Sequence, residues 1–105
     1  MAESTNPHPI DVAHLAASYQ YMGLRTISSL DLYFNRYLAT GARLRAILEN
    51  DLANAITQSV DEEALEELPD VVRFLVAHAP EEAWGSRAIV NAWLKRRKTP
   101  ASQLA

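Results

Sequence analysis

Asn50 and Asp51 are the polar pair best placed to do chemistry in this sequence, because they interrupt an otherwise apolar helical segment. A carboxylate at the edge of an apolar stripe must be either paired or hydrated. Asp51 either accepts hydrogen bonds from a neighbouring helix start or from an arginine such as Arg73 or Arg87, or it has a direct functional role. A single carboxylate with no general base at a recognisable distance along the sequence does not make a catalytic site. We therefore interpret Asn50 and Asp51 as structural polar residues.

The motif Trp84-Gly85-Ser86 has the residue types of a turn followed by a helix cap. Glycine permits backbone angles that other residues resist, and serine is a favoured N-cap. Ser86 is accordingly predicted to be structural. Trp84 either anchors the turn or belongs to an exposed recognition patch, since tryptophan is frequent in binding hot spots.

Residues for enzyme or metal chemistry are scarce. The chain has no cysteine, its three glycines are scattered, and no Gly-x-Ser-x-Gly motif is present. His8 lies in a predicted tail, and His14 and His78 belong to different predicted helices, so the three histidines do not form a zinc motif. We predict no catalytic residues, no metal site, no cofactor and no enzymatic activity.

Charge is strongly segregated along a chain whose net charge is −3. Eight acidic residues and one base, Arg73, lie between Asp61 and Glu82, whereas five bases and no acid lie between Arg87 and Ala105. The acidic block from Asp61 to Asp70 is most simply a solvated face, and it could also meet the basic end of another copy. The basic cluster comprises Lys95, Arg96, Arg97 and Lys98. It is either a solvated helix end or a surface that contacts nucleic-acid phosphates.

Four tyrosines, at positions 19, 21, 33 and 37, fall within two predicted helices. That number exceeds what a core of this size needs, and tyrosine is enriched at protein interfaces. We therefore predict that Tyr19, Tyr21, Tyr33 and Trp84 contribute to partner binding, together with the basic cluster.

Hydrophobic periodicity predicts an all-α protein, a compact bundle of about five short helices. The chain has 105 residues, of which 49% are hydrophobic, and this suits one domain with a real core. Glycine and proline set the predicted boundaries at Gly23, Gly41, Pro69 and Pro80. The predicted helices are 10–22, 29–40, 42–58, a segment from 61 with a break near Leu68, 69–79 and 87–97. Within 42–58, Arg45 and Glu49 form a predicted ion pair four residues apart.

Residues 10–98 are predicted to form the single helical domain, with flexible tails at 1–9 and 99–105. No apolar run approaches the ~20 residues of a membrane span, and the N-terminus has no signal-peptide pattern. A cytoplasmic location is the resulting expectation.

Three motifs, in order over residues 30–94, resemble a family of small uncharacterised helical proteins encoded by bacteriophages and prophages. The first is Tyr37 to Gly41, followed by Leu44 to Leu52; the second is Phe74-Leu75-Val76 with Ala79-Pro80; the third is Trp84-Gly85-Ser86 with Val90 and Trp93. The sequence departs from the family at Arg43, where an aromatic is frequent, and at Ala83, where a cysteine is frequent. The resemblance implies a helical fold and a phage-associated setting in a bacterial host, without a mechanism.

These features together predict a non-enzymatic protein-interaction module. It would bind a host or phage protein, or associate with itself as a homo-oligomer. The alternative is a nucleic-acid-binding accessory protein that uses the basic end of the last helix.

Overall fold

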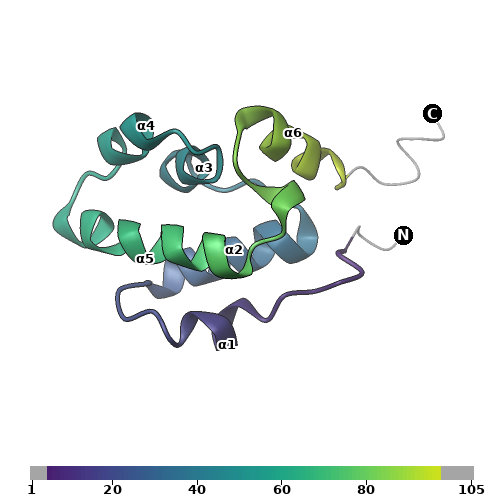
Figure 1. The fold of residues 1–105 in the computed structure, drawn as a ribbon, viewed down its shortest axis with the longest axis horizontal. Helices are drawn as coiled ribbons and strands as arrows, with labels where there is room; N and C mark the ends of the chain where they lie inside the picture. The colour runs from purple at the N-terminus through teal and green to yellow at the C-terminus, as the bar shows by residue number, and fades with distance from the viewer. Residues whose placement is uncertain (1–4, 98–105) are drawn as a thin grey trace.

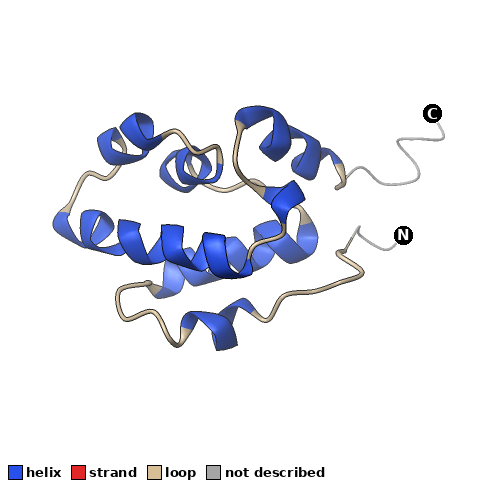
Figure 2. Ribbon diagram, viewed as in Figure 1, coloured by secondary structure: helices blue, strands red, loops and turns tan. Residues whose placement is uncertain are grey.

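The computed structural model describes residues 5–97, and these form an all-α fold, as predicted (Figures 1 and 2). Over that range there are six α-helices, one short 3-10 helix and no strand. The helices are α1 (Val12–Ala16), α2 (Leu24–Arg36), α3 (Ala42–Leu48), α4 (Leu52–Thr57), α5 (Glu62–His78), η1 (Glu81–Ala83) and α6 (Arg87–Lys95). The predicted tail at 99–105 lies outside the described residues. No helix within residues 5–97 is long and apolar enough to cross a membrane.

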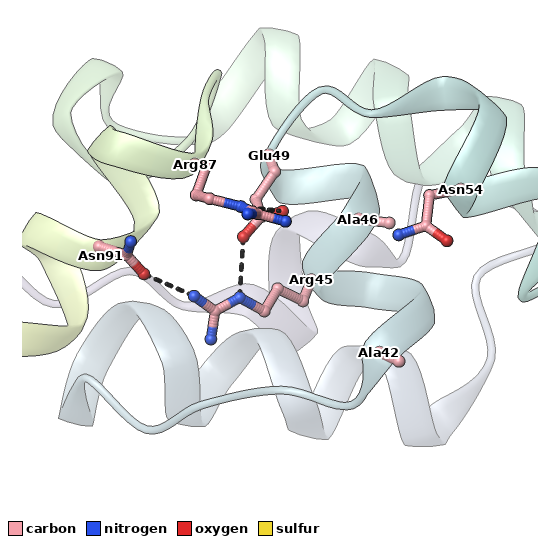
Figure 3. Close-up of a pocket in the computed structure, with 7 residues that line it drawn as sticks. All are labelled: Ala42, Arg45, Ala46, Glu49, Asn54, Arg87 and Asn91. Carbon is pink, nitrogen blue, oxygen red and sulfur yellow. Dashed lines mark hydrogen bonds and ion pairs between the residues drawn. The ribbon is translucent and has the colours of Figure 1, made fainter.

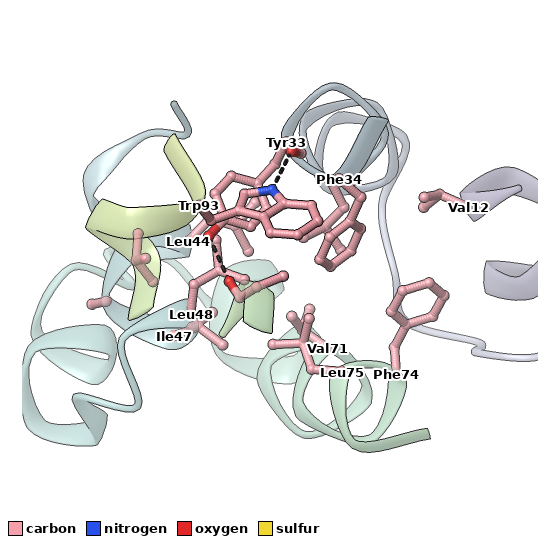
Figure 4. Packing of buried hydrophobic residues seen from close by; sticks show 14 of the residues in the cluster. Val12, Tyr33, Phe34, Leu44, Ile47, Leu48, Val71, Phe74, Leu75 and Trp93 are labelled. Carbon is pink, nitrogen blue, oxygen red and sulfur yellow. Dashed lines mark hydrogen bonds between the residues drawn. The ribbon is translucent and has the colours of Figure 1, made fainter. Parts of the chain in front are cut away.

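The long helix α5 crosses the middle of the molecule, with α1 on one side of it and α3 and α4 on the other (Figure 1). Buried side chains from every α-helix meet in one core, part of which is drawn in Figure 4. The largest fully buried side chains are Trp93, Tyr33, Phe34 and Phe74. Burial of such side chains from water is the main favourable contribution to folding.

Two hydrogen bonds join η1 and α6 to α2 inside this core. The indole Nε1 of Trp93 donates to the backbone oxygen of Tyr33 at 2.8 Å, and the Tyr33 hydroxyl donates to the backbone oxygen of Ala83 at 2.5 Å. The ring of Tyr37 meets that of Trp93 edge-on, with centroids 5.1 Å apart. Both large polar aromatics are therefore satisfied internally, which fixes η1 and α6 against α2.

Two carboxylates of the acidic block are buried, so the prediction of a solvated face is wrong for Glu67 and Asp70. Glu67 accepts hydrogen bonds from the backbone N–H of Gly23 at 2.7 Å, from the Thr26 hydroxyl at 2.8 Å and from Arg43 at 2.6 Å. Asp70 accepts one from the backbone N–H of Tyr21 at 2.9 Å. These bonds hold the start of α2 against α5, where a negative charge also suits the helix dipole.

The glycines predicted to end helices instead precede them. Gly23 and Gly41 are the N-cap residues of α2 and α3, both with extended backbone. Helix α2 ends at Tyr37, which takes the left-handed conformation at φ 58° that was expected of a glycine. Helix α1 stops at Ala16, well before Gly23. Contacts with Glu67 start α2 five residues earlier than its own sequence pattern indicates.

The predicted break near Leu68 does not occur, because α5 continues through Pro69. Proline lacks the N–H that would bond to the carbonyl four residues earlier, which belongs to Leu65. Both Leu65 and Pro69 are exposed, so the lost hydrogen bond lies on the water-facing side of the helix.

The predicted tail at residues 1–9 is anchored at its described end. The N–H of Asn6 donates to the backbone oxygen of Asn35 at 2.8 Å, and its amide donates to that of Phe34 at 3.0 Å. The Asn35 side chain in turn donates to the oxygen of Ile10 and accepts from its N–H. These bonds satisfy carbonyls that the end of α2 would otherwise leave unpaired.

Replacement of the buried carboxylate should be costly. Glu67→Gln leaves Arg43 without its ionic partner, and we expect the free energy of unfolding to fall by about 2 kcal/mol. Urea denaturation measures this change. Glu66→Gln is the matched control, since Glu66 is exposed, and it should change stability by less than about 0.5 kcal/mol. Equal effects of the two variants would contradict a structural role for Glu67.

Candidate functional site

An apolar groove between α4 and α5 is the most distinctive surface feature of the described chain. It encloses about 270 Å³ and has almost entirely apolar walls. Its lining consists of Ile47, Asn50, Asp51, Leu52, Ala55, Leu68, Val72, Val76 and Trp84. The groove therefore brings together three of the residues that the sequence singled out, Asn50, Asp51 and Trp84.

The predicted helix 42–58 is interrupted at Asn50 and Asp51, which contradicts a continuous helix. Asn50 has a left-handed backbone with φ 61°, and the N–H groups of Asn50 and Asp51 bond back to the carbonyls of Ile47 and Ala46. This pattern is the Schellman motif that ends many helices. Asp51 then begins α4 as its N-cap and accepts the N–H of Asn54 at 3.2 Å.

Asp51 thus serves a helix start, one of the structural roles expected of it. The arginines considered as alternative partners pair elsewhere: Arg73 contacts Asp70 at 3.2 Å, and Arg87 lies 3.7 Å from Glu49. The order Asn-Asp was itself a usable signal, because asparagine tolerates the left-handed position and aspartate is a preferred N-cap.

The motif at 84–86 forms the predicted turn and cap. Gly85 has φ 126°, a conformation that favours glycine, and its N–H donates to the backbone oxygen of Leu48 at 2.7 Å. Ser86 caps α6 by accepting the N–H of Ile89 at 3.1 Å. Trp84 is half-buried and packs against the core while it also lines the groove. Trp84 therefore anchors the turn, as one of the two predictions has it, and it also reaches the surface at the groove.

A second, polar hollow lies between α3 and α6 (Figure 3). Glu49 accepts from Arg45 at 2.8 Å, which confirms the predicted pair four residues apart, and Arg45 also donates to Asn91 at 2.5 Å. Arg87 approaches Glu49 from the start of α6. The Glu49 side chain is only 7% exposed and pairs with two arginines. This cluster therefore joins α3 to α6, and its two bases and one acid give it a net charge of +1.

The tyrosines predicted to bind a partner are distributed differently from that expectation. Tyr33 is 1% exposed, so its assignment to a binding surface is wrong. Tyr19 is half-buried, and its ring packs edge-on against Phe74 and His78. Tyr21 alone of the three presents much surface, with 51% exposed. The number of tyrosines was a misleading signal for a binding surface, because tyrosine rings and hydroxyls make contacts inside the core.

The described members of the basic cluster, Lys95, Arg96 and Arg97, are exposed at the end of α6, while Lys98 lies outside the described residues. The Arg96 guanidinium lies 4.4 Å from the centre of the Trp93 ring, a cation–π contact. No second feature of the described chain points to nucleic acid at this end, and that alternative remains a prediction from the sequence.

Titratable groups do not converge in the groove. His78 contacts Tyr19 and Phe74 and is absent from the groove lining. Over residues 5–97, no three histidine or acidic side chains are arranged to hold a metal ion. The groove therefore offers apolar contact and one carboxylate, Asp51, which suits binding rather than acid–base chemistry.

Comparison with protein families, with curated proteins and with solved structures finds no match to this chain. The interpretation of the groove therefore rests on its own residues.

Substitutions at Asn50 and at Asp51 should have different effects on the free energy of unfolding. Asp51→Ala removes the cap of α4 and should lower the free energy of unfolding by about 1 kcal/mol. Asn50→Gly suits the left-handed position and should leave stability unchanged or slightly raised. Urea denaturation of both variants distinguishes them. A destabilising Asn50→Gly combined with a neutral Asp51→Ala would contradict this description of the break.

Tyr33 should make stability sensitive to alkaline pH. Burial raises the pKa of its hydroxyl well above the ordinary value of about 10. The folded chain therefore keeps a proton that the unfolded chain loses, so this contribution is complete below about pH 10 and declines as pH rises further, by about 1.4 kcal/mol per pH unit. Urea unfolding from pH 9 to about 11 should show a shallower decline in Tyr33→Phe.

Tyr21→Phe is the matched control, because it removes a phenol that is largely exposed. A decline in Tyr33→Phe as steep as in the unsubstituted chain would contradict the assigned role of Tyr33.

Proposed function

We propose that this chain is a non-enzymatic protein-interaction module that binds a partner protein in the groove between α4 and α5. The resemblance in sequence further suggests a phage-associated accessory protein that works in the cytoplasm of a bacterial host. The partner is then a host or phage protein, with self-association as the alternative.

The observation that carries this proposal is the concentration of exposed apolar side chains on the two helices that form the groove and on their link, two of which, Leu52 and Val76, line the groove. Eight large hydrophobic residues of the described chain are exposed, and five of them lie on α4, on α5 or on the link between them. Those five are Leu52 (63% exposed), Ile56 (47%), Val60 (87%), Leu65 (44%) and Val76 (70%). Single exposed apolar residues are ordinary, but a gathered patch is typical of interaction surfaces.

The engagement of the polar groups supports binding over catalysis. Asp51 caps a helix, Ser86 caps another, and Glu49 and Glu67 are held by arginines. Each of these side chains is committed to the fold, and none is paired with a histidine. Trp84 at the groove wall adds a residue type that is prominent in binding hot spots.

The test makes the groove surface polar and compares this with the same kind of substitution at an exposed leucine elsewhere. In the double variant Leu52→Ser/Val76→Ser, both exposed walls of the groove become polar. Leu24→Ser is the matched control, because Leu24 is 83% exposed and lies outside the groove. Affinity capture from host cells, quantified by mass spectrometry, should recover a partner with the unsubstituted chain and the control, and lose at least about tenfold with the double variant.

Light scattering on the same three proteins reports self-association. A mass that falls in the double variant alone identifies a second copy as the partner. Equal capture by all three proteins would overturn the proposal, as would a single-chain mass combined with no captured protein.

A further inference from the structure

We infer that the partner segment is an amphipathic helix whose apolar stripe is flanked by basic residues. This inference rests on the proposed function and adds the chemistry of the partner to it. It is carried by the shape of the groove, by the absence of strand edges over residues 5–97 and by the charge that surrounds the groove.

The groove has the dimensions of a helix-binding site. One wall is a stripe along α5 at helical spacing, formed by Leu68, Val72 and Val76, and the exposed Leu65 lies one turn before Leu68. From Leu68 to Val76 the helix rises about 12 Å, which matches about two turns of a partner helix. Leu52 and Ala55 of α4 line the opposite wall, with Ile56 exposed one turn further along α4.

The fold favours a helix over an extended peptide as the occupant. Extended peptides usually bind by adding a strand to an exposed sheet edge, where backbone groups supply the affinity. The described chain is built from helices, whose backbone groups are bonded internally. An occupant must therefore bind through side chains placed along one face, which is the recognition mode of an amphipathic helix in a groove.

The charge around the groove selects a basic partner. Between Asn50 and Val72 the sequence contains seven acidic residues and no base. Glu67 and Asp70 are used internally by the start of α2, and Asp61 and Glu63 line a separate hollow beside Arg25 and Arg43. Asp51 lines the groove itself, and Glu62 and Glu66 are exposed on the first turns of α5. The next base along α5, Arg73, is already paired with Asp70. Asp51, Glu62 and Glu66 therefore outnumber the exposed base Arg73, and such a predominantly acidic surface attracts a cationic partner and repels an anionic one.

The same charge argues against a symmetric dimer through this groove. A two-fold contact places the same surface on both sides, so a predominantly acidic surface would face another predominantly acidic surface. Like charges across an interface are unfavourable. A separate helix with lysine or arginine beside its apolar stripe fits better than a second copy of the chain.

The experiment uses two designed peptides as probes. Each is a helix of about 18 residues, long enough to be partly helical alone, with one leucine stripe. One carries lysines beside the stripe and the other carries glutamates at the same positions. Binding to the full chain is measured by fluorescence anisotropy at low and at high salt. We expect the lysine peptide to bind at least about tenfold more tightly at low salt, with the difference shrinking as salt is added.

Variants locate the binding. Leu52→Ser/Val76→Ser should abolish binding of the lysine peptide, and Leu24→Ser should retain it. Glu62→Lys/Glu66→Lys should reverse the preference between the peptides while the apolar walls stay intact. Circular dichroism confirms that each variant is folded.

The possible failures are distinguishable. Equal binding of both peptides would overturn the basic-flank inference while leaving an apolar interaction site. Binding of neither peptide, or binding unaffected by the groove substitutions, would overturn the inference about the partner, whereas the proposed function stands or falls with the capture experiment. A dimer lost only in the groove variant would replace the basic helix with a second copy.

Discussion

The buried carboxylate of Glu67 is the interaction on which the arrangement of the helices depends. It receives the first backbone N–H of the α2 start, the hydroxyl of Thr26 and the guanidinium of Arg43, so it joins α2, α3 and α5 at one point. A buried charge is tolerable only when such donors surround it. Because Glu67 and Phe74 turn one side of α5 toward the core, the Leu68–Val76 stripe lies away from them and is left to form a groove wall.

The second wall results from a local event in the chain. In α3 the apolar residues Leu44, Ile47 and Leu48 are buried, whereas Leu52 and Ile56, which continue the same spacing, are exposed. The left-handed backbone at Asn50 changes the direction of the chain, and α4 begins in the new direction with Asp51 as its N-cap. One polar pair that looks merely structural therefore creates the exposed apolar surface beside it.

Sequence reasoning succeeded where the determinants are local. The all-α class, the turn at Gly85, the Ser86 cap and the Arg45–Glu49 pair all follow from short-range patterns, and each is present. It failed where a distant residue decides. The early start of α2 depends on Glu67, more than forty positions away, and no local pattern marks that carboxylate as buried. The groove was missed because periodicity predicts which residues are apolar but not which of them find partners in the core.

The two tryptophans occupy sharply different surroundings. Trp93 is 1% exposed and bonded to α2, whereas Trp84 is half-buried at the groove wall. The fluorescence of an indole depends on its contact with water, so the emission of each tryptophan reports on its own surroundings. Trp93 senses the integrity of the core, and Trp84 senses whether the groove is filled. Folding and occupancy can consequently be followed separately in the unlabelled molecule, by retaining one tryptophan at a time.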